Sequence, residues 1–121
     1  MTNTISVLLV ASAFIGMGTI ALIRPALIMK LVDGSAATIN SRNEIRAVYG
    51  GFGICLGLLL VLIEPMYSEL SKGVYLASGV ALAGMAVGRL ISVFIERPGL
   101  LPWFYMLIES AAACLLFAEL M

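Results

Sequence analysis

Four long apolar stretches constrain this chain more than any other feature of its sequence. Each has about the 20 residues that a helix needs to cross the hydrocarbon core of a bilayer, and a proline follows each of the first three. Inside lipid, a spanning segment must satisfy its own backbone hydrogen bonds, which favours helices over open strands. The predicted spans are residues 5–23, 43–63, 70–95 and 101–120. The sequence therefore predicts an all-α fold, a four-transmembrane-helix bundle in which residues 1–121 form a single integral membrane domain.

The composition agrees with a lipid environment. Hydrophobic residues make up 62% of the chain and charged residues only 12%, too little polar surface for a soluble domain of 121 residues. The formal net charge is zero and there is no basic block, which disfavours nucleic acid as a partner. There is no histidine, the commonest metal ligand, so we expect no metal site and no cofactor. We expect Cys55 and Cys114 to be small buried apolar residues.

Residues 24–42 connect the first two predicted spans. Pro25 suits the first turn of a helix. An apolar stripe follows it, at Leu27, Ile28, Leu31 and Val32. We expect a short helix that lies in the membrane interface between the first two spans, followed by a loop.

Lysine and arginine are distributed unevenly over the connections. Most of them flank the first and third connections: Arg24, Lys30, Arg42, Arg46 and Arg97. Lys72 stands nearly alone on the other side. The positive-inside rule then places the first and third connections in the cytoplasm and both termini outside. The first stretch lacks the positive leading region of a signal peptide, so we interpret it as a retained span.

The polar residues of the spans converge on one leaflet under this topology. Arg89 lies about 9 Å and Glu109 about 12 Å along their helices from the cytoplasmic end. The second span begins at the same end. The residues that share this leaflet are Asn43, Glu44, Arg46, Tyr49, Arg89, Tyr105 and Glu109. They predict a polar pocket near the cytoplasmic face.

Arg89 and Glu109 are expensive to place in hydrocarbon. A charged residue near a helix centre costs about 2.5–3.5 kcal/mol on insertion scales, so both side chains should face inward and pair. Arg89 has an alternative, because its long side chain reaches the interface by snorkelling. Glu109 is too short for that, and must find a donor, become protonated or line water.

Structural explanations compete with functional ones at several of these positions. Ser41 and Glu44 fit a Ser-x-x-Glu capping box at the start of the second helix. Arg46 also fits the positive-inside rule, and Tyr49, Trp103 and Tyr105 fit an aromatic belt. Gly53-x-x-x-Gly57 and Gly84-x-x-x-Gly88 are typical of helix packing. The small faces of the second and fourth helices either pack tightly or leave a cavity beside Glu109.

Three motifs carry a resemblance to a known family. "NEIRAVYGGFG" at 43–53, "GRLIS" at 88–92 and "LIES" at 107–110 resemble a family of small bacterial four-helix membrane proteins, a domain of unknown function. The resemblance covers nearly the whole chain and implies an inner-membrane location, but no activity. Its signature polar positions would be Asn43, Glu44, Arg46, Arg89 and Glu109. At the level of architecture, the chain also looks like small membrane-embedded terpene cyclases and epoxide hydrolases.

The first functional hypothesis is a protein that binds a lipid-like small molecule from the cytoplasmic leaflet, or transforms it without a cofactor. Glu109 and Glu44 would be the catalytic acid and base for isomerisation, cyclisation or epoxide opening. Arg46 and Arg89 would hold an anionic or oxygen-bearing group. Asn43, Tyr49 and Tyr105 complete the expected ligand-binding set.

Two other classes remain open. The chain is a structural or assembly subunit if the buried charges only specify helix register, and its glycine motifs then suit a homo-oligomer or tight packing within one chain. A small four-helix transporter is the third hypothesis. Small multidrug transporters depend on a glutamate in the first helix, however, and residues 5–23 contain no ionisable side chain.

Overall fold

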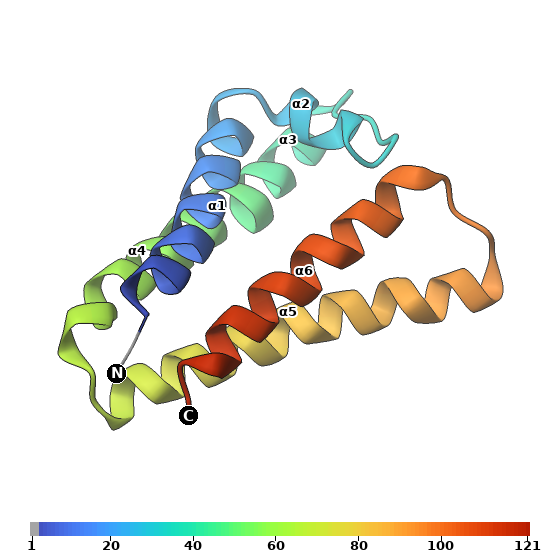
Figure 1. Ribbon diagram of the computed structural model, residues 1–121. Helices are drawn as coiled ribbons and strands as arrows, with labels where there is room; N and C mark the ends of the chain where they lie inside the picture. Colours follow the sequence, from blue (N-terminus) through green and yellow to red (C-terminus); the bar gives the residue numbers. More distant parts are fainter. Residues whose placement is uncertain (1–2) are drawn as a thin grey trace. The chain divides into compact units, whose positions relative to one another are not determined.

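The computed structural model describes residues 3–121, which form helices and short connections with no strand (Figure 1). In chain order the elements are α1 (Thr4–Ile23), α2 (Pro25–Lys30), α3 (Ile39–Ile45), η1 (Arg46–Gly51), α4 (Phe52–Ile63), η2 (Glu64–Met66), α5 (Glu69–Ile95) and α6 (Leu100–Ala118). Four helices in this part of the chain are long and apolar enough to cross a membrane. They are Thr4–Ile23, Ile39–Met66, Glu69–Ile95 and Leu100–Ala118. The predicted all-α class, its four apolar helices and the short helix after the first are confirmed.

The second long helix begins four residues earlier than predicted. Thr38 is its N-cap, and the Thr38 hydroxyl accepts a hydrogen bond from the Ser41 backbone N–H at 3.1 Å. The Ser41 hydroxyl accepts one in return from the Thr38 N–H, at 3.2 Å. The capping box therefore joins Thr38 to Ser41, and of the two explanations left open for Glu44 the helix cap is excluded. Glu44 lies beyond the first turn, where no free N–H remains for it to cap.

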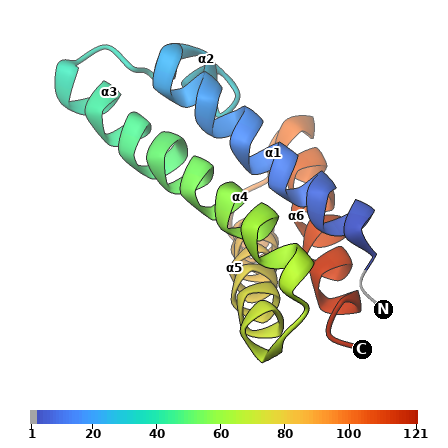
Figure 2. The ribbon, with the colours of Figure 1, turned by 90° about the vertical axis from the view of Figure 1, so that its left-hand side faces the viewer.

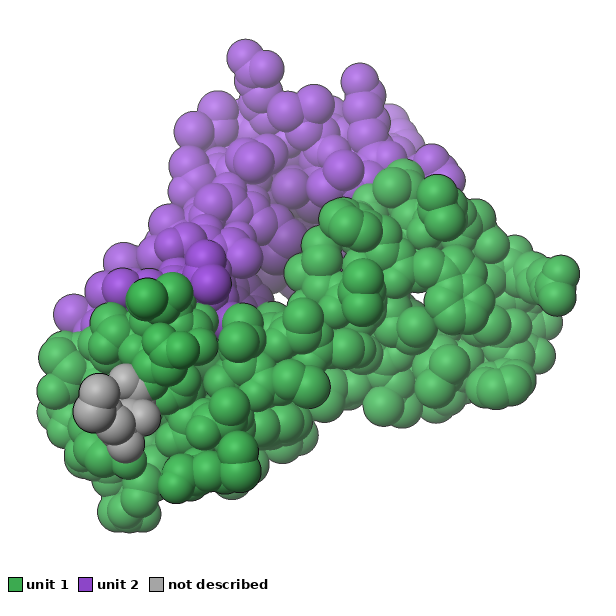
Figure 3. All heavy atoms as spheres, viewed as in Figure 1, with its two compact units in different colours: residues 1–7, 63–121 green, residues 8–62 purple. Residues whose placement is uncertain are grey.

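The chain divides into two compact units, and each is described by itself (Figure 3). Unit 1 contains residues 1–7 and 63–121, and therefore the pair α5 and α6. Unit 2 contains residues 8–62, and therefore most of α1 and of α4 together with α2, α3 and η1.

Unit 2 is built on a close approach between two helices that run side by side, α1 and the η1–α4 segment (Figure 2). A Cβ atom on Gly57 would lie 2.8 Å from the Ala11 carbonyl oxygen, and one on Gly18 would lie 2.8 Å from that of Gly50. Only glycine lets the two backbones come this near. The small face of the second span is thus packed against the first, and leaves no groove there.

The short helix α2 covers the end of this pair. Pro25 occupies its first turn, as the sequence predicts. Ile28 packs in a small core with Ala21 and Ile45. The helix ends at Lys30, so Leu31 belongs to the turn that follows, and the apolar stripe is only partly helical.

Unit 1 consists mainly of α5 and α6, which pack against each other. Near one end the Phe117 ring fills the space over Gly79, where a Cβ atom would lie 2.6 Å from the ring. A Cβ atom on Gly84 or Gly88 would meet nothing of unit 1 within 4 Å. The second glycine motif therefore packs against no helix of its own unit.

The outer surface of both units is strongly apolar. Phe94 is 83% exposed and Leu100 is 84% exposed, as expected for side chains that face lipid. Cys55 and Cys114 are also exposed, which corrects the prediction that both are buried. The sequence assigns them to apolar helices correctly, but lipid-facing positions of such helices are as apolar as buried ones.

Candidate functional site

The Arg89–Glu109 ion pair is the most strongly connected polar group of unit 1. Arg89 Nε donates to Glu109 Oε2 and Arg89 Nη2 donates to Glu109 Oε1, both at 2.7 Å. The carboxylate side chain is only 9% exposed and the guanidinium side chain 29% exposed. Two parallel hydrogen bonds of this kind are among the strong charge-assisted interactions in proteins.

The pair settles the alternatives open for both residues. Arg89 turns its guanidinium to α6 and pairs, as the cost of charge in hydrocarbon predicts. Glu109 has found donors for both of its oxygens. The ion pair consequently ties α5 to α6 at one register.

Tyr105 completes this cluster. It lies one helical turn before Glu109, on the same face of α6, and the guanidinium carbon of Arg89 is 5.3 Å from the centre of its ring. A cation at this distance from an aromatic face is attracted by the ring quadrupole. Tyr105 therefore contacts a site residue, which the aromatic-belt explanation alone does not require.

In unit 2, residues Arg46–Gly51 form a π-helical segment that the sequence does not reveal. Such wide turns are rare and often occur at functional sites. Arg46, its first residue, donates from Nε to the Leu22 carbonyl oxygen at 3.0 Å. Leu22 lies in the last turn of α1, where unpaired carbonyl groups attract a cation. Arg46 thus fastens two helices together and does not line the pocket described next.

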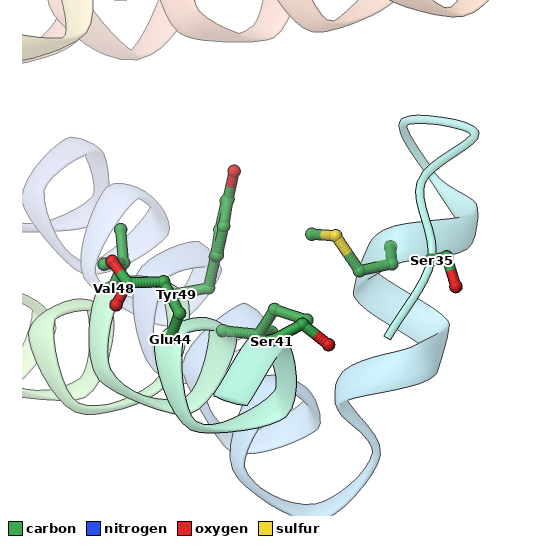
Figure 4. A pocket seen from close by; sticks show the side chains of 7 residues that line it. Ser35, Ser41, Glu44, Val48 and Tyr49 are labelled. Atoms are coloured by element: carbon green, nitrogen blue, oxygen red, sulfur yellow. The ribbon is translucent and has the colours of Figure 1, made fainter. Parts of the chain in front are cut away.

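An open pocket of about 360 Å³ lies where α2, the loop after it, α3 and η1 meet (Figure 4). Its lining is mainly apolar, with a few polar groups: Met29, Ser35, Ser41, Glu44, Ile45, Val48 and Tyr49. In Figure 4 the Tyr49 ring stands out from its helix. Such a lining suits a molecule that is mostly apolar and carries one polar group.

Glu44 is the only ionisable carboxylate in this lining. It is exposed, and no hydrogen bond or ion pair holds it within residues 3–121. Arg42, two residues before Glu44, donates from Nη1 to the carbonyl oxygens of Ala36 and Ala37. With Arg46 also held by a carbonyl, the pocket has a free carboxylate and no cation in its lining.

The structure thus places the predicted site residues in two groups. Arg89, Tyr105 and Glu109 come together in unit 1, and Glu44 and Tyr49 line the pocket of unit 2. Asn43 is exposed and does not line the pocket. The convergence of the two groups on one shared site stays a prediction.

Sequence reasoning missed most of the pocket. Met29, Ser35 and Ser41 come from the connection between the first two spans, which carries no chemical motif. Ile45 and Tyr49 could have been associated, because residues four apart share a helix face. Among residues 3–121, no three His, Cys, Asp or Glu side chains are grouped so that they could hold a metal ion.

The fold and these two groups define a class, the small integral membrane proteins with four apolar helices and ionisable side chains inside them. Within that class the chain belongs to the family described as Domain of unknown function (DUF4345), whose model matches residues 2–120. A search of the curated proteins and a search of the solved structures each found no match.

Proposed function

We propose that this protein binds a lipid-like small molecule in the pocket of unit 2. The observation that carries the proposal is the combination of an apolar lining with one unpaired carboxylate, that of Glu44. A volume of about 360 Å³ lies within the range of known small-molecule sites. It would hold the head and first few carbons of a lipid-like molecule, while the rest of the chain stays in the bilayer.

The free groups of the pocket favour a ligand whose head donates hydrogen bonds, such as a hydroxyl. Glu44 is a strong acceptor that has no partner in the described part of the chain. The Ser41 hydroxyl is committed to the helix cap, because it also donates to the Thr38 carbonyl. The head of the ligand would then be oriented by Glu44 and Tyr49.

Proton transfer at the bound head is the chemistry this pocket would support, in an isomerisation, a cyclisation or an epoxide opening. Glu44 is the first candidate for the acid or base because neither of its oxygens is engaged. Glu109 would have to give up a hydrogen bond from Arg89 before it exchanged a proton. Neither Arg46 nor Arg89 lines this pocket, so their proposed role in holding an anionic group would belong to a separate site.

The test is native mass spectrometry of the protein released from lipid nanodiscs. The wild type should retain a lipid-like adduct. Val48→Trp, which fills the pocket, should lose the adduct, and Glu44→Gln should weaken its binding about tenfold, the value of one hydrogen bond to a charged group. The matched control is Asn40→Ala, an exposed position of α3 outside the lining. Equal adducts in Val48→Trp and wild type would contradict the proposal.

A second candidate function is that of an assembly subunit, and the open face of α5 favours it. Gly84 and Gly88 lie four residues apart and contact no helix of their own unit. In membranes, a pair of small residues at this spacing is a common helix-association surface. Gly88→Leu should then lower the fraction of oligomer measured by energy transfer between labelled chains in nanodiscs, whereas Gly73→Leu should not.

We also propose a bacterial inner-membrane location with both termini outside the cytoplasm. The support is the charge bias of the connections, with Arg24, Lys30 and Arg42 between the first two spans and Lys72 at the other end.

A further inference from the structure

A second polar cluster lies in unit 1, where the start of α1, the start of α5 and the end of α6 come together. Tyr75 is 0% exposed and Glu119 is 6% exposed, whereas Glu64 is half-buried. Three buried serines, Ser6, Ser71 and Ser78, lie on the same helices, α1 and α5. Tyr75 precedes Arg89 by 14 residues on α5, or about 21 Å. The cluster is therefore separate from the Arg89–Glu109 pair.

Two consecutive residues at the start of the chain hold two carboxylates close together. The Asn3 backbone N–H donates to Glu119 Oε2 at 2.6 Å, and the Thr4 hydroxyl donates to Glu64 Oε1. Since adjacent Cα atoms are about 3.8 Å apart, the two carboxylates lie within roughly 10 Å of each other. Both contacts connect segments more than 50 positions apart in the sequence, so they are a product of the fold.

Tyr75 of α5 is a buried polar residue on which the charges of both carboxylates act. Its hydroxyl is fully buried and has no hydrogen-bond partner among residues 3–121. It interacts electrostatically with both Glu64 and Glu119. A buried polar group without a partner lowers stability, and natural folds rarely keep one unless a ligand, ion or water completes it.

The charge of the cluster indicates the kind of ligand. No Lys or Arg of the described residues forms an ion pair with Glu64 or Glu119; Lys72 pairs with Glu69 instead. The available atoms are all oxygens, from two carboxylates, a phenol and the Thr4 hydroxyl. Oxygen ligands suit hard cations such as Na⁺, Mg²⁺ and Ca²⁺, and carboxylates also accept hydrogen bonds from a primary ammonium.

We propose that Glu64, Glu119 and Tyr75 form a binding site for a small cation. The cation is either an inorganic ion or the ammonium of a lipid headgroup. It sits between the two carboxylates and takes the Tyr75 hydroxyl oxygen as a further ligand. Because only two carboxylates take part, water completes the coordination of an inorganic ion. The site also ties the start of α1 to the ends of α5 and α6.

Thermal unfolding in nanodiscs of defined composition tests the site. In phosphatidylcholine discs with choline chloride, which supplies no small cation, the wild type should unfold at its lowest temperature. Replacing choline by NaCl, MgCl₂ or CaCl₂ at equal ionic strength tests inorganic ions, and adding phosphatidylethanolamine tests the ammonium headgroup. At roughly ten times the Kd, the ligand that binds should raise the Tm by about 5 °C.

Three variants identify the site as the cause. Glu119→Gln and Tyr75→Phe keep the size of their side chains, and each should reduce the increase in Tm by at least half. Glu69→Gln removes an exposed carboxylate from the first turn of α5 and should leave the increase unchanged. If Tyr75→Phe simply raises the Tm in every buffer and keeps the full cation response, the hydroxyl is an unused buried group and the proposal is wrong. The same conclusion follows if no cation and no headgroup changes the Tm of the wild type.

Discussion

Arg89 and Glu109 form an ion pair that is costly to bury and costly to break by removing only one partner. Taking two charges out of water costs several kcal/mol per ion, and mutual attraction in the apolar interior returns that cost only with good geometry. Here both oxygens of Glu109 are engaged, and the Tyr105 ring lies against the guanidinium. The pair specifies how α5 and α6 align, and its removal as a unit should cost little.

A double-mutant cycle measures this. Arg89→Met should destabilise the protein by about 3 kcal/mol, because it leaves the Glu109 carboxylate buried without a donor. Arg89→Met combined with Glu109→Met should recover most of that loss. The measurement is reversible unfolding in detergent micelles. Additive effects of the two single substitutions would show that the pair has no coupling energy.

The pairing of Arg89 with Glu109 could be predicted from the sequence, because an isolated charge in hydrocarbon has a high free energy and a charged partner lowers it. The contact of Tyr105 with Arg89 could not be separated from an aromatic belt, since both place a tyrosine near the interface. The cap at Thr38 was missed for another reason. Thr38-x-x-Ser41 and Ser41-x-x-Glu44 overlap in the sequence, and only the backbone shows which residue precedes the first turn.

A pair of substitutions checks the corrected helix start. Thr38→Ala should cost about 1 kcal/mol of stability, the usual value of an N-cap side chain. Glu44→Ala should change stability by less than about 0.5 kcal/mol, because Glu44 is exposed and makes no contact that the cap needs. Comparing the unfolding free energies of both variants decides between the two boxes. A larger loss in Glu44→Ala would restore Glu44 as the capping partner.

At the scale of elements, α1 and α4 depend on glycine and not on large side chains. The backbones meet at Gly57 and Ala11, where the obstacle to a larger residue is a carbonyl oxygen and cannot rotate away. Lipid is as apolar as leucine, so close packing is what drives helices together in a membrane. The sequence predicts that the glycines of residues 43–57 form a packing surface. It does not predict which helix packs against them, because each of the other spans also contains small residues.

Two glycine substitutions separate packing from helix propensity. Gly57→Ala should destabilise the protein by about 2 kcal/mol, since its methyl group would press on the Ile15 side chain and the Ala11 carbonyl. Gly73→Ala has open space around it and should stabilise α5 by up to about 1 kcal/mol. The measurement is the free energy of unfolding of both variants in the same detergent. Equal effects would mean that α1 and α4 do not pack through Gly57.

The π-helical segment lies outside what local sequence can specify. Its residues, Arg46–Gly51, would form an ordinary α-helix by propensity, apart from two glycines. The wider turn comes together with tertiary contacts of the same segment, the Arg46 bond to Leu22 and the packing of Gly50 on Leu22. When tertiary contacts determine whether a segment is α-helical or π-helical, the residues of the segment alone do not predict its helix type.

At the scale of the whole molecule, hydropathy alone predicts the four spans within a few residues, because lipid leaves the backbone no other structure. The pocket of unit 2 could not be predicted in the same way. Part of its lining comes from α2 and the loop after it, whose path depends on the packing of Ile28 with Ala21 and Ile45. Membrane orientation is likewise a property of the whole chain and its insertion.

Cysteine accessibility in intact cells tests the predicted orientation. In a background with Cys55→Ser and Cys114→Ser, Ser35→Cys should resist an impermeant maleimide until the cells are opened. Ser68→Cys should react at once, because the connection after η2 lies outside in the predicted topology. The reverse pattern would invert the orientation.

Binding of a lipid-like molecule beside Glu44 is the central claim, and photocrosslinking tests it most directly. A long-chain alcohol that carries a diazirine near its hydroxyl is added to the protein in nanodiscs, activated by light, and its adducts are located by peptide mass spectrometry. The account predicts adducts concentrated on Met29, Ile45, Val48 and Tyr49, and their loss in Val48→Trp or with an excess of the unlabelled alcohol. Adducts spread evenly over lipid-facing positions such as Phe94 and Leu100, unaffected by either change, would contradict it.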